Sequence, residues 1–504
     1  MPTPPTALII LDGVGHAGDN PDNAVYHART PTLDMLKARY PHTLLQASGT
    51  AVGLPAGFIG NSEVGHMTIG CGRVITQPIT ILNDMIDDGF FGQQKGLLAC
   101  LEASKQANGR LHVMGLLSDG GVHAHERQLH EFVRAAAQQG VKEIYVHAFI
   151  DGRDVAPRSA ELYLGRLAKV LADIDTAKLG SIHGRFYAMD RDCNWRRTQQ
   201  SYQVLTGQEA SVSDSWYVLL EESYQRGDTD QFFRPVLLDE AAAIRNGDAV
   251  IFANVRPERA RQLTAALLQD DFTGFDRDKI TLSCFLTPVA YNDFAGVTVM
   301  LESTPIRDTL KDELSKADKT IFTIAETEKY AHVTYFFNGG CEKEEPGEEW
   351  VMIPSLPVRE YVDHPHMSAS EITHRLLRSF ESGPCDFYLV NYANADMVGH
   401  SGNFAATVKA VECLDEQLHL LYGVLVERMG GTIYITADHG NAEDMFNEEL
   451  NMPRTAHTAD PVPFIAADPR LADSGELLHM KGLADIAPYI LERMGLPVPA
   501  VMRR

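Results

Sequence analysis

The chain has 504 residues, of which 44% are hydrophobic and 22% charged, as is ordinary for a globular protein. This length predicts more than one domain, because single hydrophobic cores rarely exceed about 250–300 residues. The formal net charge of -24 argues against partners such as nucleic acid or anionic membranes, and an anionic substrate needs a local basic pocket.

The cysteine pattern and the first apolar segment bear on the compartment. Seven cysteines are scattered along the chain without a CxxC pair, which predicts neither a disulfide framework nor a zinc ribbon. The first apolar run, Ala7 to Leu11, is too short for a signal peptide or a membrane span. We therefore expect a cytoplasmic protein with no membrane partner.

Short apolar segments alternate with amphipathic ones along the chain. We expect strands at residues 7–11, 111–117, 143–150, 249–253, 320–325, 387–392 and 432–437. We expect helices at 124–139, 158–173, 257–269, 368–381 and 403–429, and one more that opens at Pro31. This alternation predicts an α/β fold with largely parallel sheets.

Polar residues follow six of these predicted strands. In open α/β sheets, ligands bind at the carboxyl ends of the strands. One such residue would fit an ordinary loop, but six with reactive side chains favour a functional site. They are Asp12, Asp151, Arg256, Glu326, Asp396 and Asp438.

Several short segments from both ends of the chain supply oxygen and nitrogen ligands. Such a mixed set suits divalent ions such as Mn²⁺ or Zn²⁺, and it is large enough for two ions that clamp a phosphoryl group. Each piece alone has an ordinary explanation, such as a surface ion pair or a turn, so the interpretation depends on their joint presence. The residues are Asp12, Ser62, Asp396, His400, Asp438, His439 and His457.

Ser62 lies in the segment GNSEVGH (60–66) and is the candidate nucleophile. A serine here also suits a helix N-cap, with Asn61 as the competing cap. Both functions are compatible, because the N-terminus of a helix presents free N–H groups to an anion and a bound metal would lower the pKa of the hydroxyl.

A second cluster, between residues 119 and 261, is basic. Arginine forks match carboxylate and phosphate oxygens, so several arginines after strand ends in an acidic protein indicate capture of a small anion. Ion pairing with neighbouring aspartates is the alternative explanation. The cluster contains His123, Arg153, Asp154, Arg185, Arg191, Arg256 and Arg259, and Lys329 is a further candidate.

The metal ligands lie at both ends of the chain and the arginines in the middle. This order predicts one domain formed by residues 1–76 and 304–504 and a second, inserted α/β domain at 77–303. Glycines and prolines near residues 70–78 and 297–308 mark the crossings.

Together, the motifs LDGVG, GNSEVGH, DGRD, AMDRD, AETEKYAHVT, DMVGH and ADHGN occur in an order that closely resembles the cofactor-independent phosphoglycerate mutases. These enzymes are a branch of the alkaline-phosphatase-like metalloenzymes, and the resemblance covers nearly the whole chain. It implies a monomer with two Mn²⁺ ions, an alkaline-phosphatase-like parallel-sheet domain and an inserted transferase domain. The implied reaction is the interconversion of 3- and 2-phosphoglycerate without 2,3-bisphosphoglycerate.

The resemblance also implies roles for individual residues. Asp396, His400 and His457 would bind one metal, and Asp12, Ser62, Asp438 and His439 the other. Ser62 would form phosphoserine, and Asp154 is a plausible base for the return of the phosphoryl group. Substrate would be held by His123, Arg153, Asp154, Arg185, Arg191, Arg256, Arg259 and Lys329.

This chain departs from the family pattern at three places. Glu258 replaces the usual aspartate between two arginines, the stretch Cys193-Asn194-Trp195-Arg196 replaces a more usual Asn-Arg-Trp-acid stretch, and Phe58-Ile59 replaces a usual Gln-Met. Two alternatives stay open at this point. One is a metal-dependent phosphomonoesterase or another phosphomutase of the same superfamily, which would not need the arginines. The other is a non-catalytic metal-binding or anion-sensing protein, which would not need the nucleophile.

Overall fold

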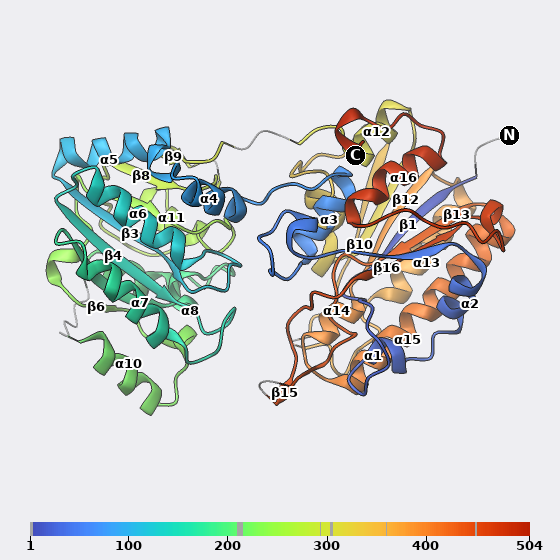
Figure 1. Cartoon of the computed structure of the whole chain (residues 1–504), viewed down its shortest axis with the longest axis horizontal. Helices are drawn as coiled ribbons and strands as arrows, with labels where there is room; N and C mark the ends of the chain where they lie inside the picture. The colour runs from blue at the N-terminus through green and yellow to red at the C-terminus, as the bar shows by residue number, and fades with distance from the viewer. Residues whose placement is uncertain are drawn as a thin grey trace. The chain divides into compact units, whose positions relative to one another are not determined.

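A computed structural model describes residues 4–208, 215–292, 294–302, 306–358, 360–448 and 451–503. The chain divides into two compact units (Figure 1). Unit 1 contains residues 1–76 and 305–504, and unit 2 contains residues 77–304. The second crossing expected from the sequence includes residues 303–305, which lie outside the described residues. In the described part of the chain, no helix has the length and apolar character needed to cross a bilayer.

Unit 1 is built on a seven-stranded sheet with the order β11-β10-β12-β1-β13-β16-β2. The strands from β11 to β13 are parallel, whereas β16 pairs antiparallel with both β13 and β2. The bounds are β1 Thr6–Leu11, β2 His42–Leu45, β10 Ile321–Glu326, β11 Glu348–Ile353, β12 Phe387–Tyr392, β13 Thr432–Thr436 and β16 Val462–Ala467. A short hairpin joins β14 Phe446–Asn447 to β15 Met452–Pro453.

The central strand of unit 1 shows why the apolar runs form this sheet. All six residues of β1 are buried, and the strand has a parallel partner on each side, β12 and β13. A strand covered on both faces carries a continuous apolar run, as TALIIL does.

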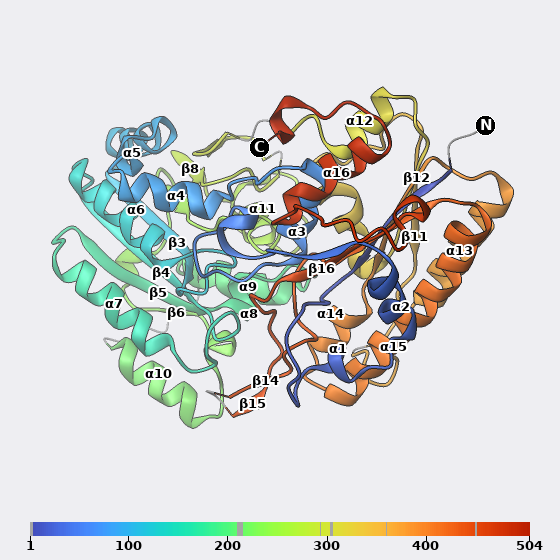
Figure 2. The same ribbon diagram turned by 45° about the vertical axis from the view of Figure 1, so that its right-hand side comes forward.

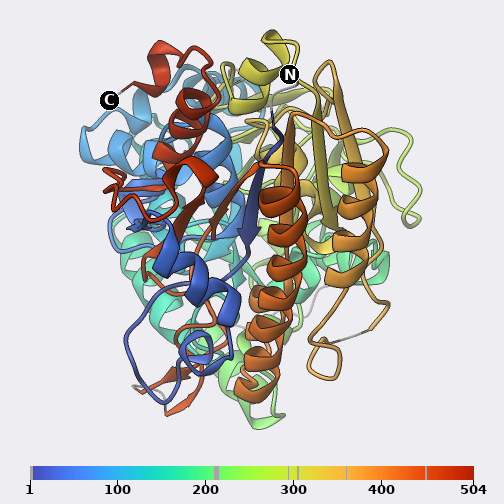
Figure 3. The ribbon, with the colours of Figure 1, turned by 90° about the vertical axis from the view of Figure 1, so that its right-hand side faces the viewer.

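Helices cover this sheet, and Figure 3 shows α13 and α15 side by side across one face. The bounds are α1 Ala24–His27, α2 Pro31–Arg39, α3 Ser62–Cys71, α12 Leu310–Lys316, α13 Ala369–Ser382, α14 Asn394–Gly399, α15 Phe404–Leu421 and α16 Ile486–Arg493. The short helical segments are η1 Gly49–Val52, η5 Thr327–Lys329, η6 His332–Phe336, η7 Tyr422–Arg428, η8 Pro469–Leu471, η9 Leu483–Asp485 and η10 Ala500–Met502.

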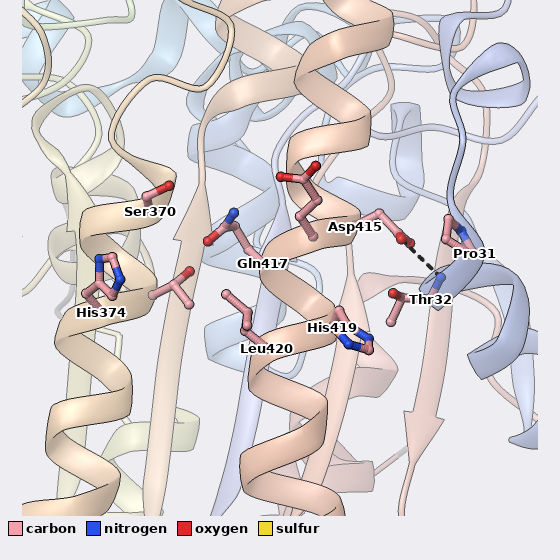
Figure 4. Close-up of a pocket in the computed structure, with 10 residues that line it drawn as sticks. Pro31, Thr32, Ser370, His374, Asp415, Gln417, His419 and Leu420 are labelled. Carbon is pink, nitrogen blue, oxygen red and sulfur yellow. Dashed lines mark hydrogen bonds between the residues drawn. The ribbon is translucent and has the colours of Figure 1, made fainter.

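Asp415 of α15 connects this layer to the start of α2. Its carboxylate accepts hydrogen bonds from the backbone N–H groups of Thr32 at 3.0 Å and Leu33 at 2.8 Å (Figure 4). Pro31 occupies the first turn of α2, as expected from the sequence. Asp415 therefore supplies the N-terminal cap that the side chain of Thr30 does not provide.

Unit 2 contains a second seven-stranded sheet with the order β6-β5-β4-β3-β7-β8-β9, parallel except for the short edge strand β6. In Figure 2, α6 and α7 lie side by side over β3, β4 and β5. The strands are β3 Arg110–Leu117, β4 Glu143–Ile150, β5 Ala177–Gly184, β6 Val236–Leu237, β7 Ala249–Phe252, β8 Cys284–Thr287 and β9 Val297–Val299. The helices are α4 Pro78–Asp87, η2 Phe91–Gln93, α5 Lys95–Ala107, α6 Glu126–Gln138, α7 Ala160–Ala172, α8 Arg185–Ala188, α9 Trp195–Leu205, α10 Trp216–Gln225, η3 Asp230–Phe232, η4 Glu240–Ala242 and α11 Arg261–Leu268.

The α/β class and the largely parallel sheets are confirmed, and each of the seven predicted strands is present within one residue of its predicted ends. Two helix predictions are corrected. The helix expected at 257–269 begins only at Arg261, after a turn. The helix expected at 403–429 is α15 to Leu421, and the wider π-helical turns of η7 follow it to Arg428.

Candidate active site

The carboxyl ends of the central strands of unit 1 meet at one place in the sheet. Asp12 follows β1, Asp438 follows β13, and Asp396 lies in α14 directly after β12. The backbone N–H of Asp396 donates to the carbonyl of Asp12 at 3.0 Å. Gly13 makes this approach possible, because it has a φ of 77° and a Cβ there would lie 2.7 Å from Asp396 Cα.

Ser62 is the first residue of α3, and Asn61 is the residue that caps the helix. The Oδ1 atom of Asn61 accepts from the N–H of Val64 at 3.3 Å. The Ser62 hydroxyl is therefore not used as a cap and points into the cluster of carboxylates. Its Oγ lies 2.9 Å from His439 Nε2 and 3.4 Å from Asp12 Oδ1.

Asp396, His400 and His457 form one set of possible metal ligands. Three atoms, Asp396 Oδ1 and the Nε2 atoms of both histidines, are separated pairwise by 3.1 to 3.2 Å. Ligand atoms at about 2.1 Å from one ion lie roughly 3.0–3.4 Å from each other. His457 Nδ1 donates to the carbonyl of Gly60 at 3.0 Å and His400 Nδ1 to that of Thr455 at 2.6 Å, which leaves both Nε2 atoms free to bind a cation.

Asp12, Ser62, Asp438 and His439 form a second set. His439 Nε2 lies 2.9 Å from Ser62 Oγ and 3.5 Å from both Asp12 Oδ1 and Asp438 Oδ2. His439 Nδ1 lies 3.2 Å from the carbonyl of Gly440 and donates to it, so Nε2 is the ring nitrogen that faces the carboxylates and Ser62. The structure thus brings the seven predicted ligands into two adjacent groups.

The charges and hydrogen bonds of this cluster fit divalent cations. Three carboxylates, those of Asp12, Asp396 and Asp438, are buried, and one ammonium group faces them. Buried carboxylates without compensating positive charge are strongly unfavourable. In addition, Asp438 Oδ2 is buried without a hydrogen-bond donor.

The ammonium group belongs to Lys329, which follows β10. Its Nζ lies 2.6 Å from Asp12 Oδ1, 2.6 Å from Asp396 Oδ2 and 2.7 Å from Ser62 Oγ. Burial alone would lower the pKa of Lys329, but Asp12 and Asp396 raise it above its ordinary value. The sequence grouped Lys329 with the arginines, whereas the structure places it in unit 1 among the metal-binding candidates.

His66 and Asn391 support the cluster, and neither was among the predicted residues. His66 Nδ1 donates to the carbonyl of Ser62 at 2.8 Å, although it also lies 3.2 Å from Asp438 Oδ2. Asn391 Nδ2 contacts Asp12 Oδ2 at 2.7 Å and His66 Nε2 at 3.0 Å. The sequence could have indicated both residues. His66 follows Ser62 by four residues on α3, and Asn391 is a polar residue in an apolar strand.

In unit 2, a basic cluster lies where β4, β5 and β7 end. Arg153 and Asp154 follow β4, Arg185 follows β5, and Arg256 and Arg259 follow β7. Because β5, β4, β3 and β7 are neighbours and parallel, their carboxyl ends share one edge of the sheet.

His123, in the loop after β3, is buried beside these arginines. Burial lowers the pKa of His123 well below its ordinary value, and Arg185, Arg256, Arg259 and Arg191 lower it further. It is therefore a neutral imidazole surrounded by positive charge, as suits a group that donates a hydrogen bond to an anion.

Arg185 holds the two aspartates of the DGRD segment. One nitrogen, Nη1, lies 2.6 Å from both Asp151 Oδ1 and Asp154 Oδ2. Burial and the charge of Asp151 raise the pKa of Asp154, while Arg185 lowers it. Arg185 is thus ion-paired with two neighbouring aspartates, and its contact with substrate stays a prediction.

Arg259 and Arg191 differ from Arg185 in their partners. Arg259 donates to the carbonyl of Met189 at 3.2 Å, and burial together with Arg191 lowers its pKa to about 10. Arg191 is exposed and 4.0 Å from Asp192. Glu258 Oε1 lies 3.3 Å from His123 Nδ1, so this departure from the family pattern contacts a predicted substrate-binding residue.

A pocket in unit 1 between α2, α13 and α15 contains none of the predicted residues (Figure 4). Its lining includes His374, Asp415 and His419. Of these, Asp415 is already engaged in capping α2.

Comparisons with known proteins agree with this arrangement. The family described as the BPG-independent PGAM N-terminus matches residues 82–293, which lie within unit 2. A 2,3-bisphosphoglycerate-independent phosphoglycerate mutase of Cellvibrio japonicus is 43% identical over 99% of this chain and 97% of its own length. The enzyme of the same description from Clostridium novyi is 43% identical over 100% of this chain and 99% of its own.

A solved structure is similar over the same extent. It is that of Leishmania mexicana phosphoglycerate mutase at low cobalt concentration, with a TM-score of 0.83 and 30% identity over 100% of this chain and 97% of that one. Identity above 40% across whole chains of curated relatives establishes the family. The chain therefore belongs to the 2,3-bisphosphoglycerate-independent phosphoglycerate mutases.

Proposed function

We propose that this protein interconverts 3-phosphoglycerate and 2-phosphoglycerate, with Ser62 as the transient carrier of the phosphoryl group. The observation that carries the proposal is the position of Ser62 Oγ, at the N-terminus of α3 and 2.9 Å from His439 Nε2. The names of the full-length relatives support the same reaction.

We further propose that two divalent ions bind in unit 1 and that Mn²⁺ is the functional metal. Asp396, His400 and His457 would hold one ion, and Asp12, Ser62, Asp438 and His439 the other. When bound, such ions lower the pKa of the serine hydroxyl and neutralise charge on the phosphoryl oxygens.

The protein's own groups prepare Ser62 for attack. Lys329 can only donate, so Ser62 Oγ accepts from it, and this contact favours the alkoxide. Ser62 is also the first residue of α3, and the N-terminus of a helix suits an incoming phosphate.

Unit 2 supplies the groups that hold the glycerate part of the substrate. Arginine guanidinium groups bind its carboxylate and phosphate oxygens, and neutral His123 donates a hydrogen bond. Asp154 then accepts the proton of the hydroxyl that takes the phosphoryl group back, for which its raised pKa is suited. The proposed substrate-binding residues of unit 2 are His123, Arg153, Asp154, Arg185, Arg191, Arg256 and Arg259.

The test is a product assay with 3-phosphoglycerate and no 2,3-bisphosphoglycerate. The protein should form 2-phosphoglycerate after incubation with Mn²⁺, lose the activity with chelator, and regain it when Mn²⁺ is returned. Release of inorganic phosphate in place of 2-phosphoglycerate would identify a phosphomonoesterase. A strict requirement for added 2,3-bisphosphoglycerate would also contradict the proposal.

A further inference from the structure

Glu443 is a buried carboxylate of unit 1 that lies beside the metal-binding candidates without belonging to either set. Its Oε2 atom accepts hydrogen bonds from the backbone N–H of Gly15 at 3.0 Å and from that of Asn441 at 2.8 Å. Its Oε1 atom accepts a hydrogen bond from the hydroxyl of Thr458. One side chain is therefore bonded to three segments of the chain, and Gly15 lies 428 residues away from it in the sequence.

Each of the three donors lies in a segment that carries candidate metal ligands. Gly15 belongs to the segment after β1 that begins with Asp12, and Thr458 directly follows His457. Asn441 belongs to the segment after β13. Glu443 thus holds together segments that supply ligands of both sets, namely Asp12, Asp438, His439 and His457.

The carboxylate of Glu443 fits against two glycines. A Cβ on Gly15 would lie 2.2 Å from Glu443 Cδ, and a Cβ on Gly440 would lie 2.2 Å from Glu443 Oε1 and 2.3 Å from Thr458 Oγ1. Neither glycine has the left-handed backbone conformation that favours this residue type. The space that the carboxylate needs therefore explains glycine at both positions.

Thr458 transmits the contact with Glu443 to His457. The backbone N–H of Thr458 donates to the carbonyl of Gly440 at 3.0 Å, so the two segments form a short antiparallel bridge. The ring of His457 stacks on that of His439, with the ring centroids 3.8 Å apart. A shift of Thr458 would therefore move His457 relative to the other ligands.

We propose that Glu443 is a positioning residue for both metal ions, and that it acts through Thr458 on the ion that His457 holds. This inference rests on the proposed two-metal function. Both oxygens of Glu443 already accept hydrogen bonds, and among the described residues the groups that could hold an ion do not include it. Loss of such an outer partner typically weakens metal binding by about 10–100-fold.

The experiment measures binding of Mn²⁺ to the metal-free full chain, with free Mn²⁺ followed by electron paramagnetic resonance. Glu443→Ala should weaken both ions by about 10–100-fold, because all three segments lose their common acceptor. Thr458→Val keeps the shape of the side chain but loses the hydroxyl, so it should weaken one ion by about tenfold or more and leave the other nearly unchanged. His400→Ala, which removes a ligand from the set that contains His457, identifies the weakened ion.

Two further variants separate positioning from a loss of stability. In Glu443→Gln, the amide oxygen can accept from the two N–H groups and the amide nitrogen can donate to Thr458 Oγ1, so most of the affinity lost in Glu443→Ala should return. Thr323→Val is the matched control, because Thr323 is a buried threonine of unit 1 whose hydroxyl donates to the buried carboxylate of Glu348 at 2.8 Å. It should lower the unfolding free energy and leave both affinities unchanged.

The outcomes distinguish this inference from the proposed function. If the wild-type protein binds two ions and both Glu443→Ala and Thr458→Val bind them with unchanged affinity, this inference alone is overturned. Equal weakening in Thr323→Val, or failure of Glu443→Gln to restore affinity, also overturns it. If the wild-type protein binds fewer than two ions, the two-metal proposal is overturned and this inference with it. Thr458→Val and Glu443→Gln decide if Glu443→Ala does not fold.

Discussion

The Nζ atom of Lys329 lies 2.7 Å from the Oγ atom of Ser62. The same ammonium group contacts Asp12 and Asp396, one carboxylate from each of the two sets of metal-binding candidates. One buried cation is therefore shared by the candidate nucleophile and both sets.

Replacing Lys329 with methionine keeps most of its length but removes this charge. We expect kcat to fall by about 10²–10³, since a preorganised donor to a developing oxyanion contributes that much. Formation of phosphoserine should slow to the same extent, as followed by intact mass after mixing with 3-phosphoglycerate. Lys319→Met is the matched control, because Lys319 pairs with Asp386 at 3.0 Å outside the cluster. A Lys329→Met enzyme with normal kcat and normal metal content would show that the contact with Ser62 has no catalytic role.

Asp154 and Ser62 should give different defects. Ser62→Ala should abolish both mutase activity and phosphoserine. Asp154→Asn should still be phosphorylated, but transfer to the second hydroxyl should slow by about 10²–10⁴, because one positioned base is lost. Phosphoenzyme should accumulate and release inorganic phosphate slowly.

Quenched-flow mass measurement of the phosphoenzyme, with a parallel phosphate assay, distinguishes these steps. Asp192→Asn, which alters an exposed aspartate beside Arg191, is the control. Near-normal turnover of Asp154→Asn would exclude Asp154 as the base. Failure to form phosphoenzyme, with metal still bound, would place Asp154 before the first transfer.

A chain of buried imidazoles should make unit 2 sensitive to acid. His112 Nδ1 lies 2.9 Å from His147 Nε2, and Ser181 Oγ links His147 to His183 with 2.7 Å on each side. Burial lowers the pKa of all three histidines, that of His183 to about 3. Asp248, bonded to His112 Nε2 at 2.8 Å, is the charged group that opposes the shift in His112.

The direction of this pH dependence follows from proton uptake by the unfolded chain. Above a pH of about 6.5, these histidines are neutral in both states and contribute no pH dependence. As the pH falls from about 6.5 toward 3, the unfolded chain binds protons that the folded chain does not, so the unfolding free energy decreases. The slope is at most about 1.4 kcal/mol per pH unit for each histidine.

Urea unfolding between pH 7 and pH 5 measures this slope in a Trp350→Phe background, where both remaining tryptophans, Trp195 and Trp216, lie in unit 2. His183→Asn should reduce the slope by up to about 1.4 kcal/mol per pH unit. His374→Asn, which alters an exposed histidine of unit 1, should leave it unchanged. An unaltered slope in His183→Asn would show that His183 does not contribute to this pH dependence.

Asp415 should stabilise unit 1 through the cap of α2. Asp415→Asn keeps one acceptor oxygen for the two N–H groups that the carboxylate binds at 3.0 and 2.8 Å. It therefore loses one charge-assisted hydrogen bond, weakens the other and should lower the unfolding free energy by about 1–3 kcal/mol. Trp350 emission in a Trp195→Phe, Trp216→Phe background reports unit 1. Asp34→Asn, which removes an exposed acid from the first turn of α2, should cost less than about 1 kcal/mol. Equal losses of unfolding free energy in the two variants would mean that burial of Asp415 does not add to the stability of unit 1.

The sequence was sufficient for the elements that carry a local signal. The run ALIIL at 7–11 predicted β1, and Asn61 and Ser62 were both recognised as candidates for the start of α3. The strands β2, β6 and β16 were among those not predicted. β6 has only two residues and β2 only four, and β16 contains Pro463. The pairing of these strands also depends on neighbours far away in the chain.

The surroundings of a side chain were harder to predict than its type. Lys329 is one lysine in the segment AETEKYAHVT, and nothing nearby in the sequence distinguishes it from an exposed residue. Its burial arises because β1 and β12 bring Asp12 and Asp396 to the same sheet edge as the end of β10.

The position of β1 between β12 and β13 has a consequence for synthesis on the ribosome. Thr6 pairs with Phe387 and Thr432, so the first strand has neither parallel neighbour until 381 further residues have been made. At about 5–20 residues per second, this wait lasts roughly 20–80 s. Unit 2 is complete by residue 304, and its sheet contains no strand from either end of the chain. The emerging polypeptide must therefore keep one of its most apolar segments from aggregating while a whole unit is made and released from the exit tunnel.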